Sequence, residues 1–237
     1  MIDPAVDALF ARAIEPYRAA GRFAWHFAAG KLRRDPVFVA LLRDGIVPAA
    51  ARLVDLGCGQ GLLAAWLAAA RAQHATGSWP RGWAPPPQVD RYWGLELMPR
   101  DVARARSALA DWGEFVAGDM RTAPLGRADV VVILDVLHYI APTEQLGVLH
   151  RVRDALPRGG VLITRIGDAA GGMPFRISQW VDRSAALARG HGWCRLHCRP
   201  LAEWESLLRE LGFAVDARPM AGHNPFANVL LVCRRHG

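Results

Sequence analysis

The spacing of apolar residues changes near residue 52, and this change divides the chain into two parts. In residues 1–45 the apolar positions recur every three or four places, which is the spacing of one helix face. That face is carried by Val6, Leu9, Phe10, Ile14 and Tyr17. Asp35 followed by Pro36 is typical of a helix start, because an acid caps the first turn and proline fits its first position. We expect residues 1–45 to form a helical lid over the rest of the fold.

From residue 52 onward, short apolar runs typical of buried strands alternate with helical patterns. The strands are expected at 51–56, 92–97, 114–119, 128–136, 159–166, 214–220 and 228–235. The helices are expected at 62–73, 101–113, 142–156 and 200–212. Such alternation predicts an α/β fold with a mostly parallel, doubly wound sheet covered by helices on both faces. We therefore assign residues 46–237 to one α/β domain, interrupted by irregular inserts at 74–88 and 167–198.

Candidate chemistry begins with the stretch VDLGCGQG, which lies between the first expected strand and its helix. Gly57, Gly59 and Gly61 give this turn backbone freedom and let a ligand approach the main chain closely. In a doubly wound sheet, ligands bind beyond the carboxyl ends of the strands. The spacing is GxGxG, because Leu62 stands where the dinucleotide pattern GxGxxG needs glycine. A dehydrogenase is therefore disfavoured, and a tight turn without a ligand is the plain alternative.

Acidic residues end the next three strands of the expected sheet. Glu96, Asp119 and Asp135 follow consecutive strands, so their carboxylates are expected at one edge of the sheet. A carboxylate at Glu96 can accept hydrogen bonds from two ribose hydroxyls, and one at Asp119 can accept from an adenine amino group. Any one of them can be an ordinary solvated acid, but three at successive strand ends indicate a nucleoside site.

Five stretches together resemble the successive motifs of class I S-adenosylmethionine-dependent methyltransferases. They are VDLGCGQG, GLELMP, AGDM, ADVVVILDVLHYI and LPRGGVLITRIGD, within residues 52–168. The resemblance implies a Rossmann-like, seven-stranded sheet whose last strand is antiparallel, with S-adenosyl-L-methionine as cofactor. Carried over by position, it implies a set of cofactor-binding residues. These are Asp55, Gly57, Cys58, Gly59 and Gly61 at the methionine end, Glu96 at the ribose, Asp119 and Met120 at the adenine, and Asp135 under the donor, with Leu97 as a further cofactor-binding residue.

The acceptor side of the site rests on fewer signals. His138 follows the fourth strand at the mouth of the expected site, so it is the candidate catalytic base; a histidine packed at a helix start is the alternative. We expect His26, Tyr139 and Arg165 to contact the substrate. For each charged group, a solvated surface position is the competing interpretation.

Composition narrows the choice of partner. The formal charge is +7 with 29 basic residues, of which only Lys31 is lysine, and the arginines are scattered. No basic block interleaved with aromatic residues appears, so no nucleic-acid partner is predicted, whereas an acidic protein or an anionic small molecule suits the charge. Neither a membrane span nor a basic signal segment is recognised, which predicts a cytoplasmic protein.

The four cysteines do not form a disulfide framework. The run HGWCRLHC at 191–198 crowds its candidate ligands into eight residues, without a second pair at the distance of a zinc finger. No metal site is predicted.

Methyl transfer to a small-molecule or carrier-bound acyl or aryl acceptor, at oxygen or carbon, is the leading functional hypothesis. An RNA methyltransferase is the alternative, although DVLH at 135–138 replaces the N/D-P-P-Y/F turn typical of base amino methylation. A non-catalytic Rossmann-like binding domain is the third reading, which the intact glycines and acids disfavour. The stretch RFAWHFAAGKLRRDPVFVALL faintly resembles methyltransferases of bacterial aryl-polyene and polyketide-like pathways. That resemblance implies a phenolic or carrier-bound acceptor.

Overall fold

The structure is a computed structural model that describes residues 3–170, 196–220 and 228–237. Its contacts group the chain into two compact units, residues 1–124 and 125–237. The hydrogen-bonded strand order is β3-β2-β1-β4-β5-β7-β6. The strands are β1 (Ala50–Leu56), β2 (Val89–Glu96), β3 (Glu114–Ala117), β4 (Val130–Leu134), β5 (Val161–Gly167), β6 (Phe213–Pro219) and β7 (Asn228–Arg235). All seven expected strands are present.

Strand direction follows the predicted pattern. β2 pairs in parallel with β1 and β3, and β4 pairs in parallel with β5. β7 runs antiparallel to both β5 and β6. The prediction of a mostly parallel seven-stranded sheet with an antiparallel last strand is therefore confirmed. β2 begins three residues before the expected position, because Val89 pairs with Ala50 although the exposed Asp90 and Arg91 hide the apolar pattern there.

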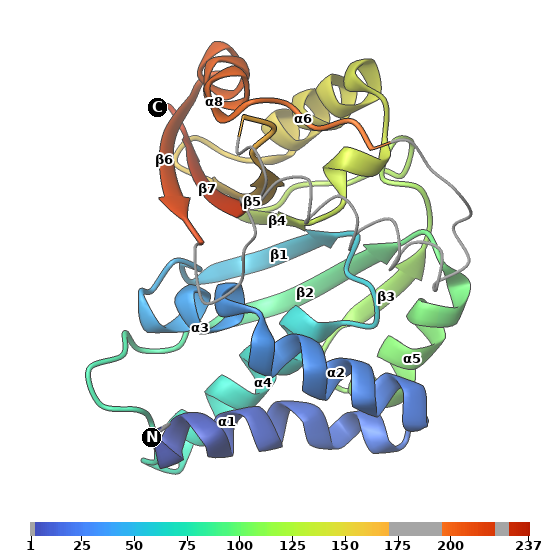
Figure 1. Ribbon diagram of the computed structural model, residues 1–237, viewed down its shortest axis with the longest axis vertical. Helices are drawn as coiled ribbons and strands as arrows, with labels where there is room; N and C mark the ends of the chain where they lie inside the picture. The colour runs from blue at the N-terminus through green and yellow to red at the C-terminus, as the bar shows by residue number, and fades with distance from the viewer. Residues whose placement is uncertain (1–2, 171–195, 221–227) are drawn as a thin grey trace. The chain divides into compact units, whose positions relative to one another are not determined.

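In the first unit, the N-terminal helices and α4 share one core. The helices are α1 (Pro4–Ile14), the 3₁₀ turn η1 (Glu15–Arg18), α2 (Arg22–Arg34), α3 (Pro36–Arg43), α4 (Leu62–Ala75) and α5 (Pro99–Leu109). Figure 1 shows α1 and α2 side by side, and α1 packs against α4, which lies behind them in this view. Trp66 of α4 is fully buried, stacks on Phe10 with ring centroids 4.9 Å apart, and donates its indole N–H to the Phe38 carbonyl at 2.7 Å.

The starts of the N-terminal helices follow the sequence signals. Asp3 accepts a hydrogen bond from the Ala5 amide at 2.9 Å, and Asp35 accepts one from the Val37 amide at 3.1 Å. Each acid is followed by proline at the first helical position, where no amide hydrogen is needed. These helices lie in the same compact unit as β1 to β3. Their separation as a lid, distinct from a domain at 46–237, stays a prediction.

The second unit is built around β4 and β5. Val130 to Ile133 are completely buried, as expected of a strand covered on both faces. The described helices of this unit are η2 (Leu137–Tyr139), α6 (Pro142–Ala155) and α8 (Leu201–Glu210). Most of the insert expected at 167–198 lies outside the described residues. Within the part of the chain that the structure describes, none of the helices has the length and apolar character needed to cross a membrane.

A buried carboxyl group links the first two strands of the sheet. Asp55 on β1 is 4% exposed and accepts a hydrogen bond from the Tyr92 hydroxyl on β2. Burial raises the pKa of Asp55 from its ordinary value of 3.8 to about 7; the Tyr92 hydrogen bond lowers it and the Glu96 carboxylate raises it. The native state therefore holds a proton that the unfolded state releases between these two pH values.

This difference in proton binding makes the stability of the fold depend on pH. The stabilisation from the bound proton is complete below pH 3.8 and is lost as the pH rises to about 7. We expect the free energy of unfolding of the wild type, relative to Asp55→Asn, to fall over this range and then level off. Urea unfolding of both proteins from pH 4 to 8 measures it. Asp90→Asn, at an exposed site on β2, is the control; a constant difference for Asp55→Asn would contradict the assignment.

Candidate active site

The glycine loop lies between β1 and α4, where the sequence places it. Gly57, Gly59 and Gly61 have φ values of 75°, 56° and 82°, a region that side chains other than glycine rarely adopt. The amides of Gly57 and Cys58 both donate to the Leu95 carbonyl, at 2.8 and 3.1 Å, which ties the loop to β2. A Cβ at Gly61 would lie 3.0 Å from side-chain atoms of both Leu109 and Phe115, so these side chains would have to shift, and the positive φ also favours glycine there.

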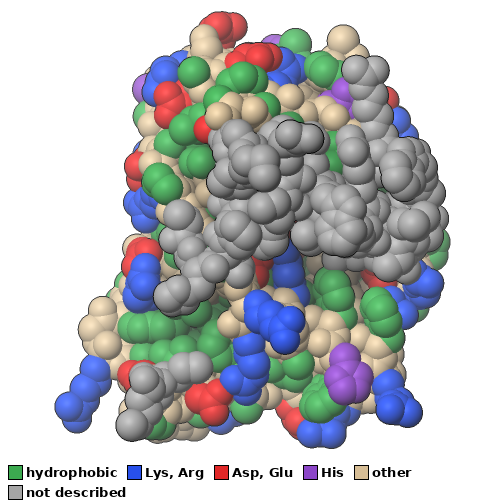
Figure 2. Space-filling model, in the orientation of Figure 1, with side chains coloured by type: hydrophobic (Ala, Val, Ile, Leu, Met, Phe, Trp, Pro, Cys, Tyr) green, Lys and Arg blue, Asp and Glu red, His purple; other side chains and the backbone are tan. Residues whose placement is uncertain are grey.

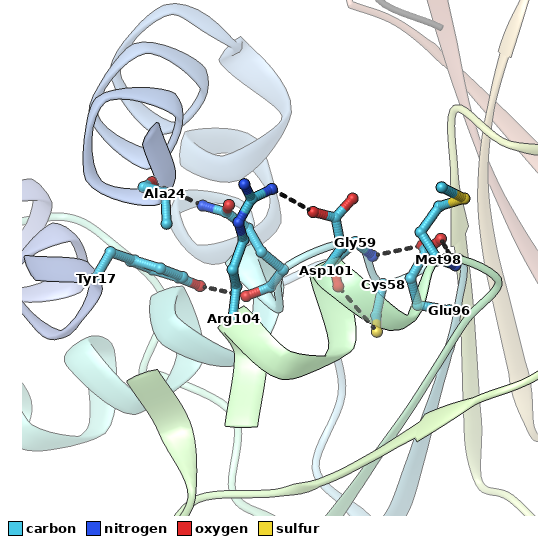
Figure 3. Close-up of polar contacts among 9 residues, drawn as sticks. Tyr17, Ala24, Cys58, Gly59, Glu96, Met98, Asp101 and Arg104 are labelled. Carbon is cyan, nitrogen blue, oxygen red and sulfur yellow. Dashed lines mark hydrogen bonds and ion pairs between the residues drawn. The ribbon is translucent and has the colours of Figure 1, made fainter. Parts of the chain in front are cut away.

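Glu96, at the end of β2, joins the glycine loop to the start of α5. Its Oε2 accepts from the Gly59 amide and its Oε1 from the Met98 amide, each at 2.9 Å (Figure 3). The residue is 9% exposed. A carboxylate offers about four lone-pair sites, so these two bonds leave capacity for a ligand hydroxyl. The Glu96 carboxylate is therefore held in place by backbone amides and is still able to bind.

The other side of the loop contacts the N-terminal helices. The Tyr17 hydroxyl donates to the Gln60 carbonyl at 3.0 Å, and the Gln60 side-chain amide donates to the Ala24 carbonyl at 2.8 Å. Tyr17 is completely buried and Gln60 is 3% exposed. Sequence analysis assigned Tyr17 to an apolar helix face. It did not predict the hydrogen bond of the hydroxyl, because apolar periodicity carries no information about polar partners.

Asp55 and Cys58 lie within the buried base of the loop. Burial raises the pKa of the Cys58 thiol well above its ordinary value, with the Asp55 and Glu96 carboxylates adding to the effect. The thiol is therefore neutral, and Cys58 is a packing residue in this arrangement. A Cβ at Gly94 would lie 2.8 Å from the Cys58 Sγ, so glycine on β2 makes room for this side chain. Contact of either Asp55 or Cys58 with a ligand stays a prediction.

The residues expected at the adenine, Asp119 and Met120, and the neighbouring cofactor candidate Leu97 differ in exposure. The Asp119 carboxylate pairs with Arg121, with Nη2 and Oδ2 2.6 Å apart, and also accepts from the Arg121 amide at 2.9 Å. Met120 is half-buried, and Leu97 is 54% exposed. Phe23, another large apolar side chain of the described chain, is also more than half exposed. The roles of Asp119, Met120 and Leu97 toward a nucleoside stay predictions.

In the second unit, the buried Arg165 pairs with Asp135, which is partly exposed. Arg165 Nε donates to Asp135 Oδ1 at 2.6 Å, and its Nη2 donates to Oδ2. The Arg165 side chain is only 2% exposed, whereas that of Asp135 is 30% exposed. Asp135 also has a φ of 59°. Among the described residues, every other residue with a positive φ is a glycine. Arg165 holds the Asp135 carboxylate at the end of β4. Contact of Arg165 with a substrate stays a prediction.

His138 and Tyr139 form the short η2 turn after β4. His138 is 9% exposed, and its ring lies 4.3 Å from that of Tyr139. The His138 carbonyl accepts from the His197 amide at 2.8 Å. The catalytic and substrate-binding roles expected for these two residues stay predictions. His26 is exposed on α2, with its ring 4.6 Å from Trp25.

Gln145 organises the same turn, and sequence analysis missed it. Its completely buried side-chain amide donates to the carbonyls of Leu137, Ile140 and His197, at 3.0, 3.2 and 2.8 Å. Its Oε1 accepts from Arg199 Nε at 3.0 Å. These bonds attach the segment that begins at Leu196 to the turn after β4. The signal in the sequence that could have indicated this role was a glutamine on the expected buried face of the helix at 142–156.

The run 191–198 lies mostly outside the described residues. No group of three or more histidine, cysteine, aspartate or glutamate residues suited to a metal ion occurs in the described ranges. Figure 2 shows arginine and lysine side chains interspersed with acidic ones over the face in view.

A model of the family described as a methyltransferase domain matches residues 24–218, which is most of the chain. A carboxy-S-adenosyl-L-methionine synthase from Chromohalobacter salexigens is 30% identical over 118 residues. That match covers 48% of this chain and 38% of the relative, so it spans well under half of the relative's length.

Solved structures of methyltransferases share the fold. Human N-acetylserotonin methyltransferase, in complex with S-adenosylmethionine, matches 99% of this chain and 60% of its own with a TM-score of 0.60 at 16% identity. Magnesium protoporphyrin IX methyltransferase from Synechocystis matches 98% of this chain and all of its own with a TM-score of 0.59 at 17% identity. The chain belongs to the methyltransferase domain family, and the predicted resemblance to class I S-adenosylmethionine-dependent methyltransferases is confirmed.

Proposed function

We propose that this enzyme transfers a methyl group from S-adenosyl-L-methionine to oxygen or carbon of a small-molecule or carrier-bound acyl or aryl acceptor. The arrangement of Glu96 is the single observation that carries the donor site. Its carboxylate is fixed by the Gly59 and Met98 amides, lies at the end of a strand, and retains lone pairs for two vicinal hydroxyls. The name of the Chromohalobacter relative also supports an adenosyl sulfonium ligand.

The residues of the first unit fit the donor chemically. Gly59 has open space where a Cβ would be, so its backbone can approach a ligand closely. Leu97, next to Glu96, exposes an apolar surface suited to a purine face. When bound, the donor supplies an electrophilic methyl on a positively charged sulfur. The protein's part is to hold that methyl in line with the acceptor atom, and such alignment alone contributes several kcal/mol.

The acceptor class is supported by what the chain contains and by its charge. The net charge of +7 favours an anionic acceptor or an acidic carrier protein. DVLH at 135–138 does not match the turn typical of base amino methylation. His138 is the proposed base for an acceptor hydroxyl or acidic carbon, since an imidazole removes a proton efficiently near neutral pH.

Replacing Glu96 with alanine tests the donor site. We expect Glu96→Ala to weaken S-adenosylhomocysteine binding by about tenfold or more, because charged hydrogen bonds to the ribose are lost. Isothermal titration calorimetry measures the change. Glu114→Ala, which removes an exposed carboxylate from β3, is the matched control and should bind as the wild type does.

A ribose contact is separated from a loop effect with the 2′-deoxy analogue of S-adenosylhomocysteine. If Glu96 binds the hydroxyl, the analogue loses affinity for the wild type but not further for Glu96→Ala. Full additivity of the two losses would assign Glu96 to loop structure alone.

The acceptor class is tested with a donor carrying a labelled methyl group. Phenolic acids, carrier-bound acyl chains and tRNA are offered in parallel, and transfer is measured by scintillation counting of each separated product. We expect label in a phenolic or carrier-bound acceptor. Label found only in tRNA would establish the RNA methyltransferase alternative, and donor binding without transfer to any acceptor would favour the non-catalytic reading.

The role of His138 is tested once the acceptor is known. We expect His138→Gln to lower kcat by about 10²- to 10⁴-fold, the usual contribution of a general base, with donor affinity unchanged. His150→Gln, on the exposed face of α6, is the control. Turnover equal to that of the wild type would leave His138 as a packed histidine of η2.

A further inference from the structure

The peptide unit between Gln60 and Gly61 is fixed at both of its polar atoms. The Gln60 carbonyl accepts from the Tyr17 hydroxyl at 3.0 Å, and the Gly61 amide donates to the Cys58 carbonyl at 2.9 Å. Gly61, which supplies the amide of this unit, and Gly59, one residue before it, both have a positive φ. Glycine turns have many accessible conformations, so the bonds around such a unit determine which one is populated.

The glycine loop is therefore held from two sides. On one side, Glu96 accepts from the Gly59 amide, and on the other, Tyr17 donates to the Gln60 carbonyl (Figure 3). The Gln60 side chain adds a second link to the N-terminal helices through the Ala24 carbonyl at 2.8 Å. Removing the Tyr17 hydroxyl would leave a buried carbonyl without this donor, which favours rotation of the peptide unit.

The properties of Tyr17 suit a permanent donor. The residue is completely buried, and burial raises the pKa of its phenol well above the ordinary value of 10.0. The hydroxyl therefore keeps its proton at any working pH. Tyr17 also precedes residue 24, where the match to the methyltransferase family model begins. The contact thus comes from a segment outside the matched part of the family.

We propose that Tyr17 is a positioning residue for the methyl donor, acting through the Gln60 carbonyl to hold the glycine loop in its donor-binding conformation. The inference rests on the proposed function, in which this loop binds S-adenosylmethionine. α1 and η1 thereby contribute to donor affinity without touching the donor. A hydroxyl that served only to stabilise the fold would leave donor affinity unchanged, and this difference makes the role testable.

Tyr17→Phe removes the hydroxyl and keeps the ring. We expect the KM for S-adenosylmethionine and the Kd for S-adenosylhomocysteine to rise about tenfold, with kcat at saturating donor within about twofold of the wild type. Gln60→Met, which removes the bond to Ala24, is expected to shift KM in the same direction. If Tyr17→Phe is recovered in low yield, Gln60→Met provides a second test of the link between the glycine loop and the N-terminal helices.

Gln73→Met is the matched control. It deletes hydrogen bonds from α4 to the Ala5 and Ser78 carbonyls, at 2.7 and 2.9 Å, so it weakens the attachment of α1 without touching the loop. We expect a lower Tm with an unchanged KM. A lower Tm without a change in KM for Tyr17→Phe, or equal KM changes for Tyr17→Phe and Gln73→Met, would overturn the positioning role. Absence of donor binding by the wild type would instead overturn the proposed function, and this role with it.

Discussion

The two hydrogen bonds of the Glu96 carboxylate are the constraint on which the candidate site depends. They join the Gly59 amide to the Met98 amide across the end of β2, so one side chain sets the positions of a loop and a helix start. A buried carboxylate is expensive to hold unless it accepts hydrogen bonds, and backbone amides meet this requirement without a competing positive charge. The same bonds orient the remaining lone pairs for a ligand.

The residues around the Glu96 carboxylate support the glycine loop in different ways. The Cys58 side chain occupies space beneath the loop that is open because residue 94 is glycine. The Tyr92 hydroxyl on β2 donates to the Asp55 carboxylate on β1. Tyr17 and Gln60 connect the loop to the N-terminal helices. The conformation of the loop is therefore a property of the whole first unit, since the strands and the N-terminal helices each supply a contact.

In the second unit, an ion pair holds the end of a strand in place. Asp135 adopts a positive φ at the end of β4, a conformation that usually persists only where neighbouring contacts favour it. Arg165 provides such a contact through two hydrogen bonds from a nearly inaccessible guanidinium. Gln145 then ties the turn after β4 to the segment at 196–199. In both units, hydrogen bonds of polar side chains fix the strand ends among the described residues.

The sequence by itself determined the strand and helix order, the glycine loop and the acids at strand ends, because these follow from local periodicity, turn chemistry and recognisable motifs. Capping at Asp3 and Asp35 was likewise readable, since a cap acts within a few residues. Only the tertiary structure decided which polar groups meet. Tyr17 and Gln60 are 43 residues apart, Asp55 and Tyr92 are 37 apart, and Gln145 and His197 are 52 apart. Apolar periodicity tells which face of an element is buried, but it does not tell which hydroxyl or amide on that face finds a partner, because that depends on how distant elements pack.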